Sequence, residues 1–173
     1  MYQNNISLRE IERITHHGRP ALSKMLTELG IKISQGNHYR KYFFNFDFFE
    51  KIDNELSAYW LGFLYADGCI LPQNKYGEQE FKISINEKDL ELLENFKKDI
   101  QSTYPIRYDK TKDSSMVIQS LRSQKAVDDL KKLGCIEKKS LFLTFPTENQ
   151  VPKEFIYHFI RGYFDGDGSI TSF

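Results

Sequence analysis

Apolar residues recur at helical or strand spacing along most of this chain, interrupted by glycine, proline or polar clusters. Before residue 45, two short apolar stripes at helical spacing are separated at Gly18 and closed at Gly30, and Pro20 suits the first turn of the second helix. The stripes consist of Leu8, Ile11 and Ile14, followed by Leu22, Met25, Leu26 and Leu29. Two short helices joined by a tight turn with glycine are typical of a helix-turn-helix.

From Asp47 onwards helical and strand patterns alternate. Asn54 can cap a helix that runs to Ala66, and Cys69–Leu71 with Phe81–Ile85 then predict a β-hairpin. The pattern continues with a helix over Asp89–Gln101, a hairpin from Pro105–Lys110 and Met116–Leu121, a helix capped by Ser123 and closed by Gly134, an extended segment over Lys139–Phe145, and a last helix from Pro152 to Gly166. This order predicts an α+β fold in which antiparallel hairpins pack helices on one face of the sheet.

Polar side chains are expected on the other face of that sheet. Phe81, Ile83 and Ile85 alternate with Lys82 and Ser84, so one face of the strand is apolar and one is polar. The candidates for contact with DNA on the polar face are Lys82, Ser84, Arg107, Gln119 and Arg122. A twisted polar sheet suits a DNA groove, although any half-solvated sheet has the same pattern.

The first 45 residues form a basic head on a chain whose net charge is zero. They hold seven Lys/Arg against three Glu, an excess of four positive charges. The exposed side of the second helix would carry Arg19, Ser23 and Lys24, side chains suited to phosphate and base-edge contacts. The head is therefore either a DNA-binding unit or a purely structural cap.

An internal repeat is the most informative feature of the sequence. Residues 58–70 (AYWLGFLYADGCI) return as residues 158–170 (HFIRGYFDGDGSI), one hundred positions later. Each copy has a glycine, a small residue four positions on, and Asp-Gly at the predicted helix end. Glycine inside a helix costs about 1 kcal/mol relative to alanine, and close approach of two helix backbones is a reason to keep it. Gly62 with Ala66, and Gly162 with Gly166, are therefore the candidate helix-interface residues.

Asp67 and Asp167 follow these small residues at the ends of the two predicted helices. A negative charge is unfavourable at a helix C-terminus, and two parallel helices would also bring both carboxylates together. A divalent cation would relieve that repulsion, because carboxylates and phosphate oxygens form a suitable shell for Mg²⁺. A single Asp-Gly would more simply be a turn, but two matching copies favour a paired site.

Both segments resemble the motif of the LAGLIDADG, or dodecapeptide, homing endonucleases. The resemblance implies a repeated αββαββα fold, recognition of double-stranded DNA by the sheet, and magnesium-dependent cleavage of phosphodiester bonds for intron homing. It assigns catalysis and metal binding to Asp67 and Asp167, with the backbone of Gly68 as a further metal ligand. A lysine before a short apolar segment is another family feature, and Lys139 matches it best, with Lys138 as second choice. Either lysine could also be an ordinary exposed charge.

Three regions are predicted. The apolar pattern gives a helix-turn-helix-like head over 1–45, and the resemblance, which covers about residues 46–173, gives a first repeat over 46–150 and the motif helix of a shortened second repeat over 151–173. Because only the first motif is followed by predicted strands, we expect either a shortened and inactive reading frame or an enzyme whose second repeat is completed by a second chain or a further C-terminal half. The main alternative to a nuclease is a DNA-binding regulator or intron-splicing maturase on the same scaffold.

Cysteine usage and hydropathy point to the compartment. Cys69 and Cys135 have no metal-ligand spacing and suit a reducing environment. There is no signal-peptide core at Met1–Glu12 and no apolar run long enough to cross a membrane. We expect a cytoplasmic protein of a bacterial or phage-infected cell, with no membrane partner.

Overall fold

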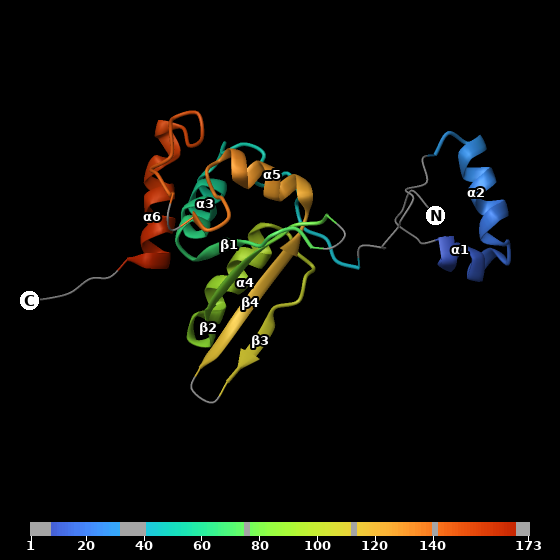
Figure 1. The fold of residues 1–173 in the computed structure, drawn as a ribbon, viewed down its shortest axis with the longest axis horizontal. Coiled ribbons are helices and arrows are strands. Elements are labelled where there is room, and N and C mark those ends of the chain that lie inside the picture. The colour runs from blue at the N-terminus through green and yellow to red at the C-terminus, as the bar shows by residue number, and fades with distance from the viewer. Residues whose placement is uncertain (1–7, 32–40, 75–76, 112–113, 140–141, 169–173) are drawn as a thin grey trace, which may run out of the picture. The chain divides into compact units, whose positions relative to one another are not determined.

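The computed structural model describes residues 8–31, 41–74, 77–111, 114–139 and 142–168. The chain divides into two compact units, Met1–Lys41 and Tyr42–Phe173, which are described separately below (Figure 1). In the described residues, no helix is both long and apolar enough to span a membrane.

The first unit holds the two helices that the sequence predicts. They are α1 (Leu8–Thr15) and α2 (Arg19–Glu28), with Gly18 at the N-cap of α2 and Gly30 in the left-handed conformation after its end, at φ 70°. Ile11 and Leu22 are buried between the helices, but Met25 and Leu29 are 50% and 73% exposed. The predicted apolar stripe of α2 is therefore covered only in part.

The second unit shows the αββαββα order, followed by a further helix of the first kind. The elements are α3 (Glu55–Asp67), β1 (Gly68–Ile70), β2 (Glu80–Asn86), the 3₁₀ turn η2 (Glu87–Asp89), α4 (Leu90–Asp99), β3 (Arg107–Lys110), β4 (Ser115–Arg122), α5 (Gln124–Lys132), the 3₁₀ turn η4 (Lys153–Phe155) and α6 (Ile156–Asp167). The two predicted caps are present: Asn54 accepts from Ser57 N at 2.9 Å, and Ser123 accepts from Ala126 N at 3.3 Å.

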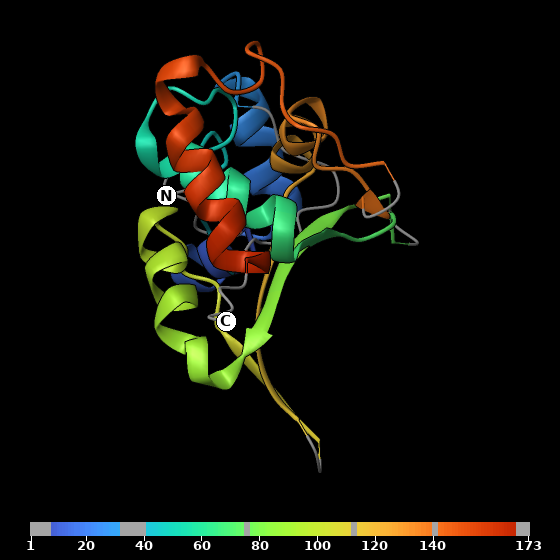
Figure 2. The same ribbon diagram turned by 90° about the vertical axis from the view of Figure 1, so that its left-hand side faces the viewer.

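The four strands form one antiparallel sheet in the order β1-β2-β4-β3. Phe81 pairs with Leu121 in the register of β2 and β4, and Ile85 pairs with Val117. These residues are buried on the face where α3, α4 and α5 pack (Figures 1 and 2). The fold is therefore the predicted α+β arrangement, with helices on one face of an antiparallel sheet.

Helix α3 lies at the centre of the core. Every residue from Ser57 to Tyr65 is buried, since the sheet layer covers one side of the helix and α6 covers the other. The Trp60 ring lies 4.9 Å from that of Phe96, and its Nε1 donates to Asp99 Oδ2 at 2.8 Å. A helix covered on two sides is apolar all round, which explains why α3 has no polar stripe.

Two details correct the sequence-based expectations. Gln119 is fully buried on the helix side of β4, in phase with Val117 and Leu121, and therefore does not lie on the polar face. The extended segment expected over Lys139–Phe145 begins instead as a tight turn, because the amides of Phe142 and Leu143 both donate to Lys139 O at 2.8 Å.

Candidate active site

Helices α3 and α6 pack side by side and parallel, with glycine against backbone at the crossing (Figure 2). A Cβ on Gly62 would overlap Phe159 O and lie 2.8 Å from Tyr163 N. A Cβ on Gly162 would overlap Tyr59 O in the same way and lie 3.0 Å from Phe63 N. The two contacts are equivalent under exchange of the helices, so the internal repeat is also a local two-fold symmetry.

The contact continues to the helix ends. A Cβ on Gly166 would lie 2.5 Å from Ala66 Cβ and 3.3 Å from Asp67 Oδ2, so the Asp67 carboxyl lies against the last turn of α6. The last residue of α6 is Asp167. The structure thus brings together the four predicted interface residues and places both predicted aspartates at neighbouring helix ends.

The helices also end in the same way. Gly68 and Gly168 both leave the helix in an extended conformation, and each amide donates back to the carbonyl four residues earlier. A Cβ on Gly68 would lie 2.5 Å from Leu64 O, which explains the need for glycine after each aspartate. Gly68 is buried and starts β1 opposite Ile83, so this strand is anchored directly to the helix end that carries Asp67.

Acidic charge is concentrated around Asp67. Partial desolvation raises the pKa of the Asp67 carboxyl above its usual value; Lys139 opposes the rise, and the charges of Asp167 and Asp89 add to it. Asp89, in η2, was not identified from the sequence, because only the fold brings η2 to this end of the helix pair. These surroundings therefore make ionisation of Asp67 less favourable than it is in water, and a nearby cation would offset that effect.

Lys139 lies on the same helix end. It is 9% exposed, and its Nζ donates to Leu64 O at 2.7 Å and to Ala66 O at 2.6 Å. An ammonium group at that place satisfies terminal carbonyls and offsets the negative end of the helix dipole. Burial lowers the pKa of Lys139, while Asp67 and Asp167 act in the opposite direction. Lys138 is exposed, so of the two predicted lysines only Lys139 lies in the site.

The donor set fits a hard divalent cation that shares its shell with a substrate. In the described ranges, no group of three or more His, Cys, Asp and Glu side chains could enclose a metal ion. Asp67 and Asp167 offer carboxylate oxygens, and Mg²⁺ usually takes only one or two protein carboxylates, with water and phosphate completing its octahedral shell. The electrostatic penalty on Asp67 is what such a cation would relieve.

The open face of the sheet carries four of the five sheet residues that were predicted to contact DNA. Lys82, Ser84 and Arg107 lie there in register, since Ser84 and Arg107 both oppose Ile118 on β4. Arg122 lies on the same face and forms ion pairs with Glu80 at 3.2 Å and Glu78 at 3.5 Å. Gln119 does not belong to this group, as described above.

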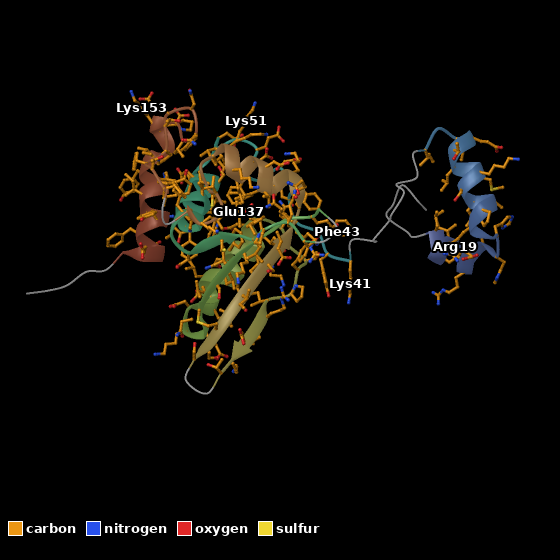
Figure 3. The ribbon with its side chains drawn as sticks, viewed as in Figure 1. Arg19, Lys41, Phe43, Lys51, Glu137 and Lys153 are labelled. Carbon is orange, nitrogen blue, oxygen red and sulfur yellow. The ribbon has the colours of Figure 1, made fainter. Side chains whose placement is uncertain are left out.

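The remaining predicted contacts are in the first unit. Arg19 and Lys24 are exposed on α2 and Ser23 is half-buried, and Arg19 (Figure 3) pairs with Glu12 at 3.2 Å. The helix-turn-helix interpretation of this unit stays a prediction.

One further contact crosses the helix pair. Tyr59 Oη donates to Asp165 Oδ2 at 2.9 Å, and the guanidinium of Arg161 lies 4.7 Å from the centre of the Tyr59 ring. The equivalent contact on the other side is the ring pair of Tyr65 and Phe159. Asp165 occupies the position of Tyr65 in the repeat. This difference between the two copies is the sequence feature from which the Tyr59–Asp165 contact could have been predicted.

Comparison with known proteins gives matches among solved structures alone. No protein-family model matches the chain, and no curated protein matches it. The chain is similar to meganuclease I-SmaMI bound to uncleavable DNA, at 22% identity over 50% of this chain and 33% of that one, with a TM-score of 0.35. It is also similar to the I-LtrWI LAGLIDADG homing endonuclease bound to target DNA, at 14% identity over 70% and 58%, with a TM-score of 0.38.

A third similar structure is the LAGLIDADG meganuclease I-CpaMI bound to uncleaved DNA, at 15% identity over 66% of this chain and 60% of that one, with a TM-score of 0.37. The chain spans between a third and three fifths of the length of these three proteins. All three similar structures are nucleases in complex with DNA: a meganuclease, a LAGLIDADG homing endonuclease and a LAGLIDADG meganuclease.

Proposed function

We propose that this chain is a homing-endonuclease subunit or half-enzyme of the LAGLIDADG family, which binds double-stranded DNA and hydrolyses its phosphodiester bonds with a divalent cation. The observation that carries the proposal is the convergence of Asp67 and Asp167 at the ends of two parallel helices that meet through Gly62 and Gly162. The site lies at the end of α3 from which β1 starts, beside a sheet with an open polar face.

Asp67 and Asp167 would hold the cation, and their carboxylates would place it between the protein and a phosphate. A bound divalent cation supplies Lewis-acid polarisation of the phosphate and lowers the pKa of water. Lys139, held between the α3 carbonyls and the aspartates, would stabilise negative charge on the attacked phosphate. One similar structure, I-SmaMI with uncleaved DNA, was obtained in the presence of calcium ions, which supports a divalent cation without identifying it as magnesium.

DNA would lie on the open sheet face. Lys82 and Ser84 project from β2 and Arg107 from β3, on either side of β4, and they offer one mixed set of charge and hydrogen-bond donors. Phosphate contacts from Lys and Arg would hold the duplex in register, and strand side chains would read base edges in the major groove. Arg19, Ser23 and Lys24 would give the first unit DNA contacts of its own.

We further propose that a second αββαββα unit, from a longer chain or another chain, packs on α6. Ile160, Phe164 and Tyr163 are 47%, 46% and 38% exposed, and they match the fully buried Trp60, Leu64 and Phe63 of α3. A groove of about 310 Å³ beside them is lined mostly by apolar groups, among them Phe145 and Phe159. The sheet layer covers the side of the first motif helix that faces away from α6, and the repeat predicts an equivalent layer on the outer side of α6.

The test is incubation of the protein with a randomised library of duplex DNA and Mg²⁺, followed by sequencing of new ends. We expect cleavage at one long site by the wild type, loss of cleavage in Asp67→Asn, and retention in the control Asp128→Asn, whose exposed carboxylate lies on α5. Cleavage that survives Asp67→Asn would contradict the proposed site. Salt-sensitive DNA binding without any cleavage would favour the regulator or maturase alternative.

A further inference from the structure

The side chain of Gln79 is a buried hydrogen-bonding hub just before β2. It is 3% exposed, and its Nε2 donates to Leu71 O at 3.1 Å and to Glu137 Oε1 at 2.7 Å. Its Oε1 accepts from Lys131 Nζ at 2.8 Å and from Gln124 Nε2 at 3.4 Å. All four hydrogen-bonding positions of the amide are used, and they join the base of the first hairpin, helix α5 and the turn after it.

Glu137 connects this hub to the active site, because it lies two residues before Lys139 in the chain. It accepts from Gln79, forms an ion pair with Lys131 at 3.3 Å, and lies in the segment after α5 (Figure 3). The hydrogen bond from Gln79, followed by that from Lys131, lowers the pKa of Glu137, so its carboxylate stays ionised at neutral pH. Its partners thus fix the side chain two residues before Lys139.

The backbone between Glu137 and Lys139 is strained. Lys138 has φ 54°, in the left-handed region, although it is not a glycine. Such a conformation is unfavourable for a residue with a side chain and persists where the surroundings enforce it. The enforcing contacts lie on both sides: Glu137 is held by Gln79, and Lys139 is held by the carbonyls of α3.

From this geometry we infer that Gln79 and Glu137 are positioning residues for Lys139, which they hold against the α3 helix end beside Asp67. The inference rests on the proposed function, which gives Lys139 its role in stabilising charge on the attacked phosphate. The contacts themselves can be tested without any cleavage. A residue that served stability alone would lower the melting temperature and leave the Lys139 amine protected.

The experiment is acylation of lysine amines on the folded protein, with the rate at each site read by mass spectrometry. Lys138 is exposed and adjacent, so it serves as the internal reference for Lys139. We expect Gln79→Leu and Glu137→Ala to accelerate labelling of Lys139 by about tenfold relative to Lys138, a factor that corresponds to about 1.4 kcal/mol of opening free energy. Glu137→Gln keeps an oxygen that accepts from Gln79 and should retain the protection.

The matched control is Glu148→Ala, which removes a different ion pair, the one that Glu148 forms with Lys153 at 3.0 Å. It should leave Lys139 protected. Wild-type protection of Lys139 in folded Glu137→Ala and Gln79→Leu would overturn the inference. If Gln79→Leu does not fold, the labelling of Glu137→Ala decides the test. The Glu137 side chain is 41% exposed, so we expect its truncation to be tolerated.

Once a cleavable DNA is known, a second readout separates positioning from binding. We expect Glu137→Ala to lower kcat while the Kd for DNA stays unchanged, and Glu137→Gln to restore kcat. Loss of DNA affinity with unchanged kcat would overturn the positioning role. A wild type that cleaves no DNA would contradict the proposed function, but the labelling result would still decide whether Gln79 and Glu137 hold Lys139.

Discussion

Gly62 and Gly162 each lie where a Cβ would overlap a backbone carbonyl of the opposite helix, Phe159 O for Gly62 and Tyr59 O for Gly162. The contact is backbone against backbone, so neither helix can yield by rotating a side chain. This relationship sets the distance between α3 and α6, and with it the distance between the two aspartates at their ends.

Gly162→Ala should therefore force the helices apart. We expect a loss of about 1–3 kcal/mol of unfolding free energy, as found for overpacked cores, and a larger loss of cleavage. Urea unfolding followed by Trp60 fluorescence measures the first effect. The control is Gly18→Ala, where the nearest atom, Pro20 Cδ, is 3.8 Å from the added Cβ. Equal stability of Gly162→Ala and wild type would contradict the tight crossing.

Asp67→Asn should abolish cleavage without destabilising the fold. The pKa of Asp67 is raised in the folded protein, so the folded state holds its proton more tightly than the unfolded state does. This group therefore makes stability fall as pH rises from its unfolded pKa through its raised folded pKa. At pH 7, without metal, the asparagine variant should melt at the same temperature as wild type or higher.

The matched comparison for Asp67 is Asp129, a buried carboxylate held by Lys125 and Lys132 at 2.8 and 2.9 Å. Asp129→Asn should lower the melting temperature, because it leaves two ammonium groups without their buried partner. Thermal unfolding by circular dichroism at pH 7 measures both variants. A marked loss of stability in Asp67→Asn would show that Asp67 serves the fold.

Matching positions of the repeat should differ in their contribution to stability. Leu64→Ala should cost about 2–5 kcal/mol, since Leu64 is 1% exposed in the core. Phe164→Ala should change the free energy of unfolding by less than about 0.5 kcal/mol, since Phe164 is 46% exposed. Denaturant titration of the two variants measures the difference. If a second unit is added and binds α6, Leu64→Ala and Phe164→Ala should lower the free energy of unfolding by similar amounts.

The open sheet face should determine the salt dependence of DNA binding. Lys82→Ala should weaken binding and reduce the slope of log K against log salt by about one, as expected for one phosphate contact. Lys98→Ala removes an exposed lysine on α4, in the helix layer, and should leave the slope unchanged. Fluorescence anisotropy at several salt concentrations measures the slope; equal slopes for the two variants would contradict DNA binding on this face.

Sequence was sufficient for the features that depend on local pattern. The caps at Asn54 and Ser123, both hairpins and the paired Asp-Gly motifs are in the structure because their signals lie within a few residues. Gln119 was misplaced because a polar residue in an alternating strand reads as solvent-facing, whereas here its Nε2 reaches Tyr104 O at 3.4 Å on the covered side.

Long-range relationships were beyond the sequence pattern. Lys139 has its position because Gln79, Glu137 and the α3 carbonyls converge from segments about sixty to seventy-five residues apart in the chain. Asp89 joins the acidic group only after β2 is paired with β1. Such convergence requires the register of the sheet, which a single sequence does not provide.

The most direct test of the account is strand cleavage of a selected duplex by the wild type, Asp67→Asn and Asp167→Asn, with and without Mg²⁺. We predict cleavage by the wild type only when the divalent cation is present. Each single variant should lose double-strand cleavage while it still binds the duplex with unchanged affinity. Undiminished double-strand cleavage by either variant, or by the wild type in the absence of any divalent cation, would contradict a metal-dependent site at the paired helix ends.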